Sequence, residues 1–231
     1  MMIKAVFFDL YHTLVGFDPP RERQYADALK AIGRDVPPET LRRPLLAADE
    51  FINQEMARRP LGQRPEAERT AVFARYARIV LTEVGIELPD TTLKGLLGQV
   101  MKVRPRLVPF EDVVPALETL GERGLILGLI SNVDRDGAAI LEDTGLLPYL
   151  KVVVTSHEVG FSKPQPEIYR EALRCGRVEP AEALYIGDQY RIDIVGANNA
   201  GMKGVLLDRY GLAEAGYAPV IRSLSETAGL L

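Results

Sequence analysis

The sequence is poor in several features that define particular classes of protein. Cys175 is the only cysteine among 231 residues, so the chain cannot form an internal disulfide or a metal site built from several thiolates. No apolar run approaches about 18 residues, the length that suggests a membrane span. The first residues also show no cleavage region of a signal peptide. We therefore expect a cytoplasmic protein that does not contact a membrane.

An excess of basic residues is also absent. Lys and Arg number 28 against 32 Asp and Glu, which gives a formal net charge of −4. This balance argues against a nucleic-acid-binding surface and predicts no nucleic-acid partner. Hydrophobic residues make up 47% and charged residues 26% of the chain, which is typical of a globular protein. A chain of this length can form one large domain or two small ones.

Residues 17–106 show helical patterns only. Tyr25, Leu29 and Ile32 repeat at helical spacing before Gly33 ends the first expected helix. We expect three further helices. The second begins at Pro37 and Pro38, the third runs from Ala67 to Val84, and the fourth runs from Asp90 to about Val103. This segment follows the first strand directly. We therefore expect residues 17–106 to form an inserted all-helical domain that covers the strand ends as a cap.

Strand and helix patterns alternate in the rest of the chain. The expected strands are Ala5–Phe8, Leu125–Ile130, Lys151–Thr155, Ala183–Ile186, Gly204–Leu207 and a short strand near Val220. The expected helices are Val113–Arg123, Asp134–Thr144, Pro166–Cys175 and Ile192–Ala200. Such alternation indicates a parallel sheet with helices on both faces. The predicted fold is therefore α/β, a doubly wound parallel sheet formed by residues 1–16 and 107–231.

Polar side chains gather at the carboxyl ends of the predicted strands. The first is Asp9, and the others are Thr13, Ser131, Asn132, Lys163, Asp188 and Asp193. Ligand sites of parallel sheets lie outside these ends, so we expect the groups around one hollow. There Asp9 could attack a phosphoryl group and form a covalent aspartyl intermediate that water later cleaves. The alternative is that Asp9 only caps the turn that follows it.

In this order and spacing, the motifs resemble those of the haloacid dehalogenase (HAD) superfamily. The helical insertion is similar to that of its subfamily I, which has a type-1 helical cap, and the resemblance spans essentially the whole chain. It implies that Asp9 is the nucleophile and that Thr13 stabilises the turn behind it. It also implies that Ser131 and Asn132 bind the transferring group. Lys163 would pair with both the nucleophile and the group under attack.

The resemblance also implies a Mg²⁺ site. Its ligands would be Asp9, Asp188 and the backbone carbonyl of Tyr11, with Asp193 supporting the ion. Carboxylates within a few ångströms of one another repel, and a cation relieves that repulsion. An alternative role for Asp193, which does not exclude the first, is to interact with the dipole at a helix N-terminus.

The position of Tyr11 departs from the family's phosphatases. These generally carry D-x-D in the first motif, and the second Asp protonates the leaving oxygen and activates the water. The family's dehalogenases carry D-x-Y in this motif, because a halide leaves without a proton. Their fourth motif resembles S-S-N-x-x-D, and they use no metal. This chain has G-D-Q-Y-R-I-D there, the metal-binding form. It therefore combines features of both groups.

Two consequences follow for the residues after the nucleophile. If Tyr11 contacts the substrate, it cannot replace the missing Asp, because a phenol is a poor general acid near neutral pH. We then expect the enzyme to prefer substrates with good leaving groups, such as acyl or aryl phosphates. The alternative is that Tyr11 only packs, and that the protein has weak or no phosphatase activity. His12 could replace the missing acid. However, neighbours in an extended chain point in opposite directions, so we expect His12 to face away from Asp9.

Three functions remain open at this point. The first is a Mg²⁺-dependent phosphatase that acts on a small phosphorylated, hence anionic, metabolite. The second is a metal-independent 2-haloacid dehalogenase with an aspartyl-ester intermediate, and the third is a weakly active protein that binds a ligand or partner. Activity that survives chelation of metal ions would exclude the phosphatase and leave the dehalogenase. Asp9→Asn should abolish both activities but leave the function of a binding protein intact. The sequence predicts neither the substrate nor the oligomeric state.

Overall fold

The computed structural model describes residues 2–133, 136–214, 216–217 and 219–231. The chain divides into two compact units, Met1–Gly16 with Leu107–Leu231, and Phe17–Arg106. The role of the second unit as a cap stays a prediction. No helix in the described ranges is long and apolar enough to cross a membrane. The cytoplasmic location also stays a prediction.

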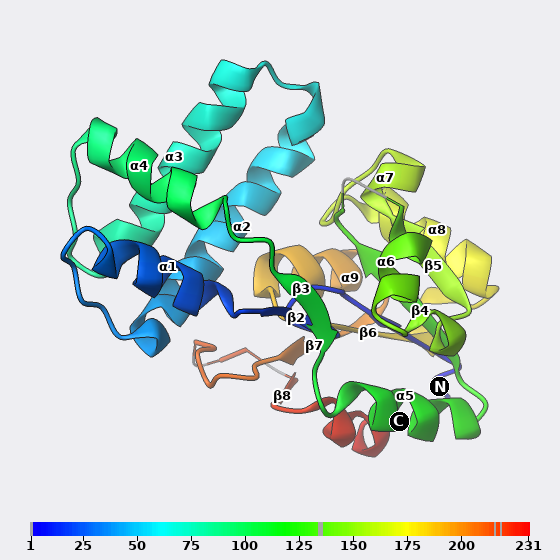
Figure 1. Cartoon of the computed structure of the whole chain (residues 1–231). Coiled ribbons are helices and arrows are strands. Elements are labelled where there is room, and N and C mark those ends of the chain that lie inside the picture. Colours follow the sequence, from blue (N-terminus) through cyan, green and yellow to red (C-terminus); the bar gives the residue numbers. More distant parts are fainter. Residues whose placement is uncertain (1, 134–135, 215, 218) are drawn as a thin grey trace. The chain divides into compact units, whose positions relative to one another are not determined.

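The first unit is built on a six-stranded sheet with the order β5-β4-β1-β6-β7-β8 (Figure 1). The strands are β1 (Ala5–Phe8), β4 (Ile126–Ser131), β5 (Val152–Thr155), β6 (Ala183–Gly187), β7 (Lys203–Leu207) and β8 (Val220–Ile221). Neighbouring strands are parallel throughout this order. The predicted α/β class with a parallel sheet is therefore confirmed. β1 lies between β4 and β6, so its carboxyl end is at the centre of the sheet's edge.

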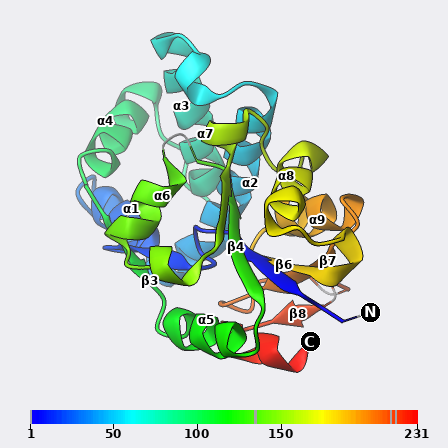
Figure 2. The ribbon, with the colours of Figure 1, turned by 90° about the vertical axis from the view of Figure 1, so that its right-hand side faces the viewer.

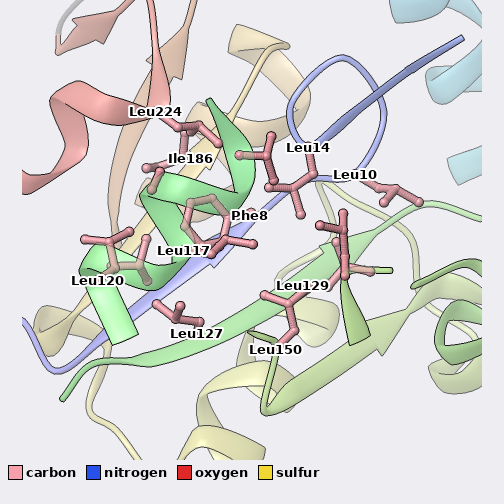
Figure 3. Close-up of a cluster of buried hydrophobic side chains, with 14 of the residues drawn as sticks. Phe8, Leu10, Leu14, Leu117, Leu120, Leu127, Leu129, Leu150, Ile186 and Leu224 are labelled. Atoms are coloured by element: carbon pink, nitrogen blue, oxygen red, sulfur yellow. The ribbon is translucent and has the colours of Figure 1, made fainter. Parts of the chain in front are cut away.

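Helices cover both faces of this sheet (Figure 2). They are α5 (Val113–Glu122), α6 (Gly137–Asp143), α7 (Ser156–Val159), α8 (Pro166–Gly176) and α9 (Val195–Asn199). Alternate side chains of β1 point to opposite faces. Val6 and Phe8 join a buried cluster with α5, α6 and the final 3-10 helix, Leu224–Gly229 (Figure 3). Ala5 and Phe7 join a second cluster with α8 and α9.

The second unit is helical apart from its ends. Its helices are α1 (Arg21–Lys30), α2 (Arg42–Arg58), α3 (Glu66–Glu83) and α4 (Asp90–Val100), with 3-10 turns at Pro38–Leu41 and Leu61–Gln63. Buried side chains from all four helices form one cluster. Two short strands, β2 (Val15–Asp18) and β3 (Arg106–Pro109), pair at the two ends of this segment. The expectation that residues 17–106 are purely helical is therefore wrong at its margins.

Two other expectations differ from the structure. The helix expected from Ile192 to Ala200 begins instead with a π-helix, Tyr190–Ile194, which continues into α9. The helix expected from Asp134 starts at Gly137, and the side chain of Asp136 accepts hydrogen bonds from the first turn as its cap. Asp134 itself lies outside the described residues. A capping residue and a widened turn are local features that hydrophobic periodicity does not reveal.

Candidate active site

Asp9 lies directly after β1 at the centre of the sheet's carboxyl edge. Its backbone N–H donates to the Ile186 carbonyl of β6 at 2.9 Å, so the parallel pairing extends to this residue. Its side chain is largely buried, with 7% of the residue exposed. Asp9 is therefore held by the neighbouring strand at the position where the sequence placed the nucleophile.

Lys163 contacts the Asp9 carboxylate from the loop between α7 and α8. Its Nζ donates to Asp9 Oδ1 and Asp193 Oδ1, both at 2.6 Å, and to the Tyr185 hydroxyl at 2.9 Å. The residue is 2% exposed. An ammonium group has three N–H donors, and these three acceptors match them. Two buried ion pairs thus fix the charge of Lys163 beside Asp9.

Ser131 is the last residue of β4, the strand between β1 and β5, and Asn132 follows it directly. The buried Ser131 hydroxyl donates to Asp9 Oδ1 at 3.2 Å. The Asn132 side chain makes two bonds with the backbone of Lys163, accepting from its N–H at 2.7 Å and donating to its carbonyl at 3.0 Å. Asn132 therefore holds the loop that carries Lys163. The prediction that Ser131 and Asn132 bind the transferring group stays a prediction.

Asp188 and Asp193 bring two more carboxylates to the same edge. One oxygen each of Asp9, Asp188 and Asp193 lies within 4.8 Å of the other two. Asp193 belongs to the π-helix and is 1% exposed, and its Oδ2 accepts the Gln189 N–H at 2.9 Å. A Cβ at Gly187 would lie 2.4 Å from Asp193 Cγ, so only glycine permits this approach. Gly187 is thus required for Asp193 to lie beside β6.

Burial and charge shift the ionisation of this cluster. Burial and, to a smaller extent, the charge of Asp193 raise the pKa of Asp9, the Lys163 ammonium lowers it, and the net result is a pKa of about 6. Burial lowers the pKa of Lys163, but the attraction of Asp193 and Asp9 outweighs it and leaves this pKa above its ordinary value. Lys163 is therefore charged at neutral pH. Its ammonium is shared by two buried carboxylates, Asp9 and Asp193, and the carboxylate of Asp188 lies close to both.

This donor set fits a divalent metal ion. Three carboxylates converge, and two of them, Asp9 and Asp193, share the single Lys163 ammonium. Hard oxygen ligands of this kind suit cations such as Mg²⁺ and Ca²⁺. Both oxygens of Asp193 already accept hydrogen bonds, from Lys163, Tyr185 and Gln189. Asp9 and Asp188 are thus better placed as direct ligands, and Asp193 as their support.

The residues after Asp9 form a tight turn and not an extended chain. His12 has φ 60°, and its N–H donates to the Val15 carbonyl at 2.7 Å. The argument that an extended chain directs His12 away from Asp9 is therefore wrong, because alternation does not hold in a turn. Tyr11 is half-buried and packs against the buried cluster that contains Phe8, a contact that is compatible with either of its two expected roles. Its contacts with metal and substrate stay predictions.

Thr13 is fully buried behind this turn, but its hydroxyl makes no hydrogen bond to another described residue. Its carbonyl instead accepts from Arg209 Nη2 at 2.7 Å, and Arg209 also pairs with Asp112 at 2.9 Å. The Arg209 guanidinium thus ties the turn to Asp112, and the role of Thr13 in stabilising the turn stays a prediction. The sequence analysis did not include Arg209, since a lone arginine after a strand carries no motif.

Tyr185 is a second polar residue that the sequence analysis missed. It lies inside β6 with its hydroxyl on Lys163. The available signal was a hydroxyl-bearing side chain in a fully buried strand, two residues before Gly187. Buried hydroxyl groups require partners, so such a position indicates a polar neighbour.

Comparisons with known proteins agree with this geometry. The family model described as haloacid dehalogenase-like hydrolase matches residues 3–201. The chain belongs to the haloacid dehalogenase-like hydrolase family. It is also 31% identical over 219 residues to a glyceraldehyde 3-phosphate phosphatase of Methanopyrus kandleri, covering 90% of this chain and 85% of that protein. The predicted family and the prediction of an enzyme are thereby confirmed.

Solved structures of this family resemble the chain along its whole length. A HAD phosphatase from Thermococcus onnurineus is 26% identical, with a TM-score of 0.60, and covers 99% of this chain and 97% of its own. A 2-haloacid dehalogenase from Pseudomonas syringae pv. Tomato is 27% identical, with a TM-score of 0.57, and covers 99% and 98%. Phosphatases and dehalogenases of the family thus share this fold, so side chains must separate the two activities.

Proposed function

We propose that this haloacid dehalogenase-like hydrolase is a Mg²⁺-dependent phosphatase that acts on a small phosphorylated metabolite through an aspartyl-phosphate. The observation that carries the proposal is the Asp9 carboxylate, which is bound by Lys163 at 2.6 Å and lies in a cluster with two further carboxylates. The dehalogenase form of the fourth motif, S-S-N-x-x-D, keeps the last carboxylate but has Ser at the position of Asp188, so a dehalogenase has no need of this third carboxylate. The relative from Methanopyrus kandleri is named as a phosphatase of a small phosphorylated compound.

Asp9 is the nucleophile in this proposal. Lys163 and Ser131 both donate to its Oδ1, so we assign the attack to Oδ2. In the first step the Oδ2–P bond forms and the bond from phosphorus to the ester oxygen breaks, and the leaving oxygen takes a proton from solvent to give the alcohol. In the second step water attacks phosphorus, which restores the Asp9 carboxylate and releases inorganic phosphate.

The other side chains prepare the site for these steps. Lys163 and Ser131 keep Asp9 in one orientation, and Asn132 holds the loop of Lys163 in register with β4. Asp9 and Asp188 would hold Mg²⁺, with the Tyr11 carbonyl as a further ligand and Asp193 as support. The bound ion would supply positive charge that stabilises the phosphoryl oxygens during transfer.

A 2-haloacid dehalogenase is the second candidate, and the observation in its favour is Tyr11. This residue stands two positions after the nucleophile, as in the D-x-Y pattern of the family's dehalogenases. The Pseudomonas syringae dehalogenase shows that the fold supports that chemistry in a protein 27% identical to this one. The reaction needs no metal and would leave Asp188 without a role.

The test is a panel of aryl, acyl and alkyl phosphates and 2-haloacids, assayed with Mg²⁺ and with a chelator. We expect phosphate release that depends on Mg²⁺ and is lost in Asp9→Asn and Asp188→Asn. Asp143→Asn is the matched control, because it makes the same change at an exposed residue that ends α6. Phosphate release that survives chelation contradicts the proposal, and halide release without metal supports the dehalogenase. A protein whose ligand binding survives Asp9→Asn would be the weakly active binding protein.

A further inference from the structure

Tyr185 is a fully buried polar side chain beneath the proposed active site. It lies in the middle of β6 and is 0% exposed. Its ring packs edge-on against Tyr169, with centroids 5.5 Å apart and planes at 78°. Burial raises the pKa of Tyr185 well above its ordinary value, so the hydroxyl keeps its proton at neutral pH. A hydroxyl group in such a place needs polar partners.

The Tyr185 hydroxyl has three of them. It lies 2.9 Å from Lys163 Nζ, 2.9 Å from Asp193 Oδ1 and 3.2 Å from the Ile130 carbonyl of β4. An ammonium group has no lone pair, so the phenol oxygen accepts from Lys163 and donates its own hydrogen to Asp193 or Ile130. The hydroxyl therefore connects β6, β4 and the loop of Lys163 at one point.

The Tyr185 hydroxyl helps to determine the position of the Lys163 ammonium. Asp9, Asp193 and Tyr185 take up the three N–H groups of its ammonium. We propose that Tyr185 is a positioning residue, whose hydroxyl holds the Lys163 ammonium on Asp9 Oδ1 during phosphoryl transfer. The inference rests on the proposed phosphatase function. Tyr185 itself touches no substrate, because its side chain is wholly buried.

Loss of the hydroxyl should slow chemistry more than binding. In Tyr185→Phe the ring still packs against Tyr169, but Lys163 loses its only neutral acceptor among the three. The ammonium is then free to turn between two carboxylates, and Asp9 is held less firmly in the orientation for attack. Small errors in the orientation of reacting groups lower the rate of the chemical step while substrate contacts remain.

The kinetic test compares Tyr185→Phe with Thr155→Val. Thr155 is also fully buried, and its hydroxyl accepts from Glu158 at the end of β5, one strand beyond β4. Single-turnover release of nitrophenolate from p-nitrophenyl phosphate measures transfer to Asp9. We expect Tyr185→Phe to lower this rate about tenfold with KM within about twofold of wild type. Thr155→Val should leave both unchanged, even where its melting temperature falls.

A second readout does not depend on the substrate. Protein with ¹⁵N-labelled lysine gives an NMR signal for a buried ammonium group whose hydrogens exchange slowly with water, and the Lys163→Arg variant assigns it. We expect the Lys163 signal in wild type and in Thr155→Val, and its loss or faster exchange in Tyr185→Phe. An unchanged signal, or a transfer rate in Tyr185→Phe within about twofold of wild type, overturns the inference. Absence of any phosphatase activity in wild type contradicts the proposed function alone, and the NMR comparison then decides the role of Tyr185.

Discussion

Each of the two units contains a largely buried group of charged side chains, and the two groups differ in their ratio of positive to negative charges. In the helical unit, Arg21 donates to both oxygens of Asp49 at 2.9 Å, and Tyr76 bonds both residues. These three residues form the Arg21 cluster. In the α/β unit, Lys163 faces Asp9, Asp188 and Asp193, which together form the Asp9 cluster.

The difference separates a structural ion pair from a functional site. In the Arg21 cluster one guanidinium binds one carboxylate through two parallel N–H···O bonds, so each charge has a counter-charge in bidentate geometry. In the Asp9 cluster two almost wholly buried carboxylates, Asp9 and Asp193, share the single ammonium of Lys163, which leaves this pair with a negative excess. Burying unbalanced charge is costly, so a fold that does so at a strand edge indicates a cation and chemistry.

The largest expected effect is on turnover. Asp9→Asn should lower phosphatase kcat by at least about 10³-fold, because the nucleophile is lost while the rest of the site remains. The exposed control Asp143→Asn should keep wild-type kcat. Phosphatase activity of Asp9→Asn near that of wild type would mean that the Asp9 cluster is no more catalytic than the Arg21 cluster.

The second effect concerns stability and pH in metal-free protein. Since folding raises the pKa of Asp9 from 3.8 to about 6, ionisation destabilises the native state as pH rises from about 4 to about 6. Above that range Asp9→Asn should be more stable than wild type by up to about 3 kcal/mol, and the difference should vanish near pH 4. Urea unfolding in the presence of a chelator measures it. A difference that is the same at every pH contradicts the charge excess.

The third effect tests the role of Tyr11 beside the nucleophile. A phenol cannot replace the general acid of the family's phosphatases, so aryl and acyl phosphates should be hydrolysed at least about 10²-fold faster than alkyl phosphates. Steady-state kcat/KM for matched aryl and alkyl esters checks this. Equal values would assign the proton transfer to another group, and His12→Ala then tests the nearest candidate.

The smallest effect concerns the Arg21 cluster. Asp49→Asn removes the carboxylate that Arg21 binds in bidentate geometry and should lower the free energy of unfolding by about 2 kcal/mol. This is less than for a fully buried pair, because 18% of the Arg21 side chain is exposed. Unfolding by urea measures it, with Asp27→Asn, whose ion pair with Arg23 is exposed, as the control. Equal losses in the two variants would contradict the structural role of the Arg21 cluster.

The sequence predicts the edge of the sheet better than what lies beneath it. Asp9, Ser131, Lys163 and Asp193 could be brought together in advance, because parallel strands end at a common edge and each carries a polar residue there. The contact of Tyr185 with Lys163 could not, since it joins the inside of a strand to a distant loop. The pattern of the strand predicts that Tyr185 is buried, but it does not predict which residues the side chain contacts.

Local backbone geometry was the other limit. The left-handed conformation of His12 and the π-helix at Tyr190–Ile194 place the residues around Asp9 and Asp193, and neither has a periodic signal. The balance of the Arg21 cluster was equally invisible, because Arg21 and Asp49 lie on different helices. Such pairs follow from tertiary packing and not from spacing along the chain.

The central claim is that the negative excess around Asp9 serves a covalent phosphoryl transfer. The most direct measurement is mass spectrometry of acid-quenched protein during turnover of an aryl phosphate with Mg²⁺. We predict that the peptide containing Asp9 gains the mass of one phosphoryl group, and that Asp9→Asn and chelated wild type do not. Turnover of the phosphate ester without any modification of that peptide, or a phosphoryl group on a different residue, would contradict the account.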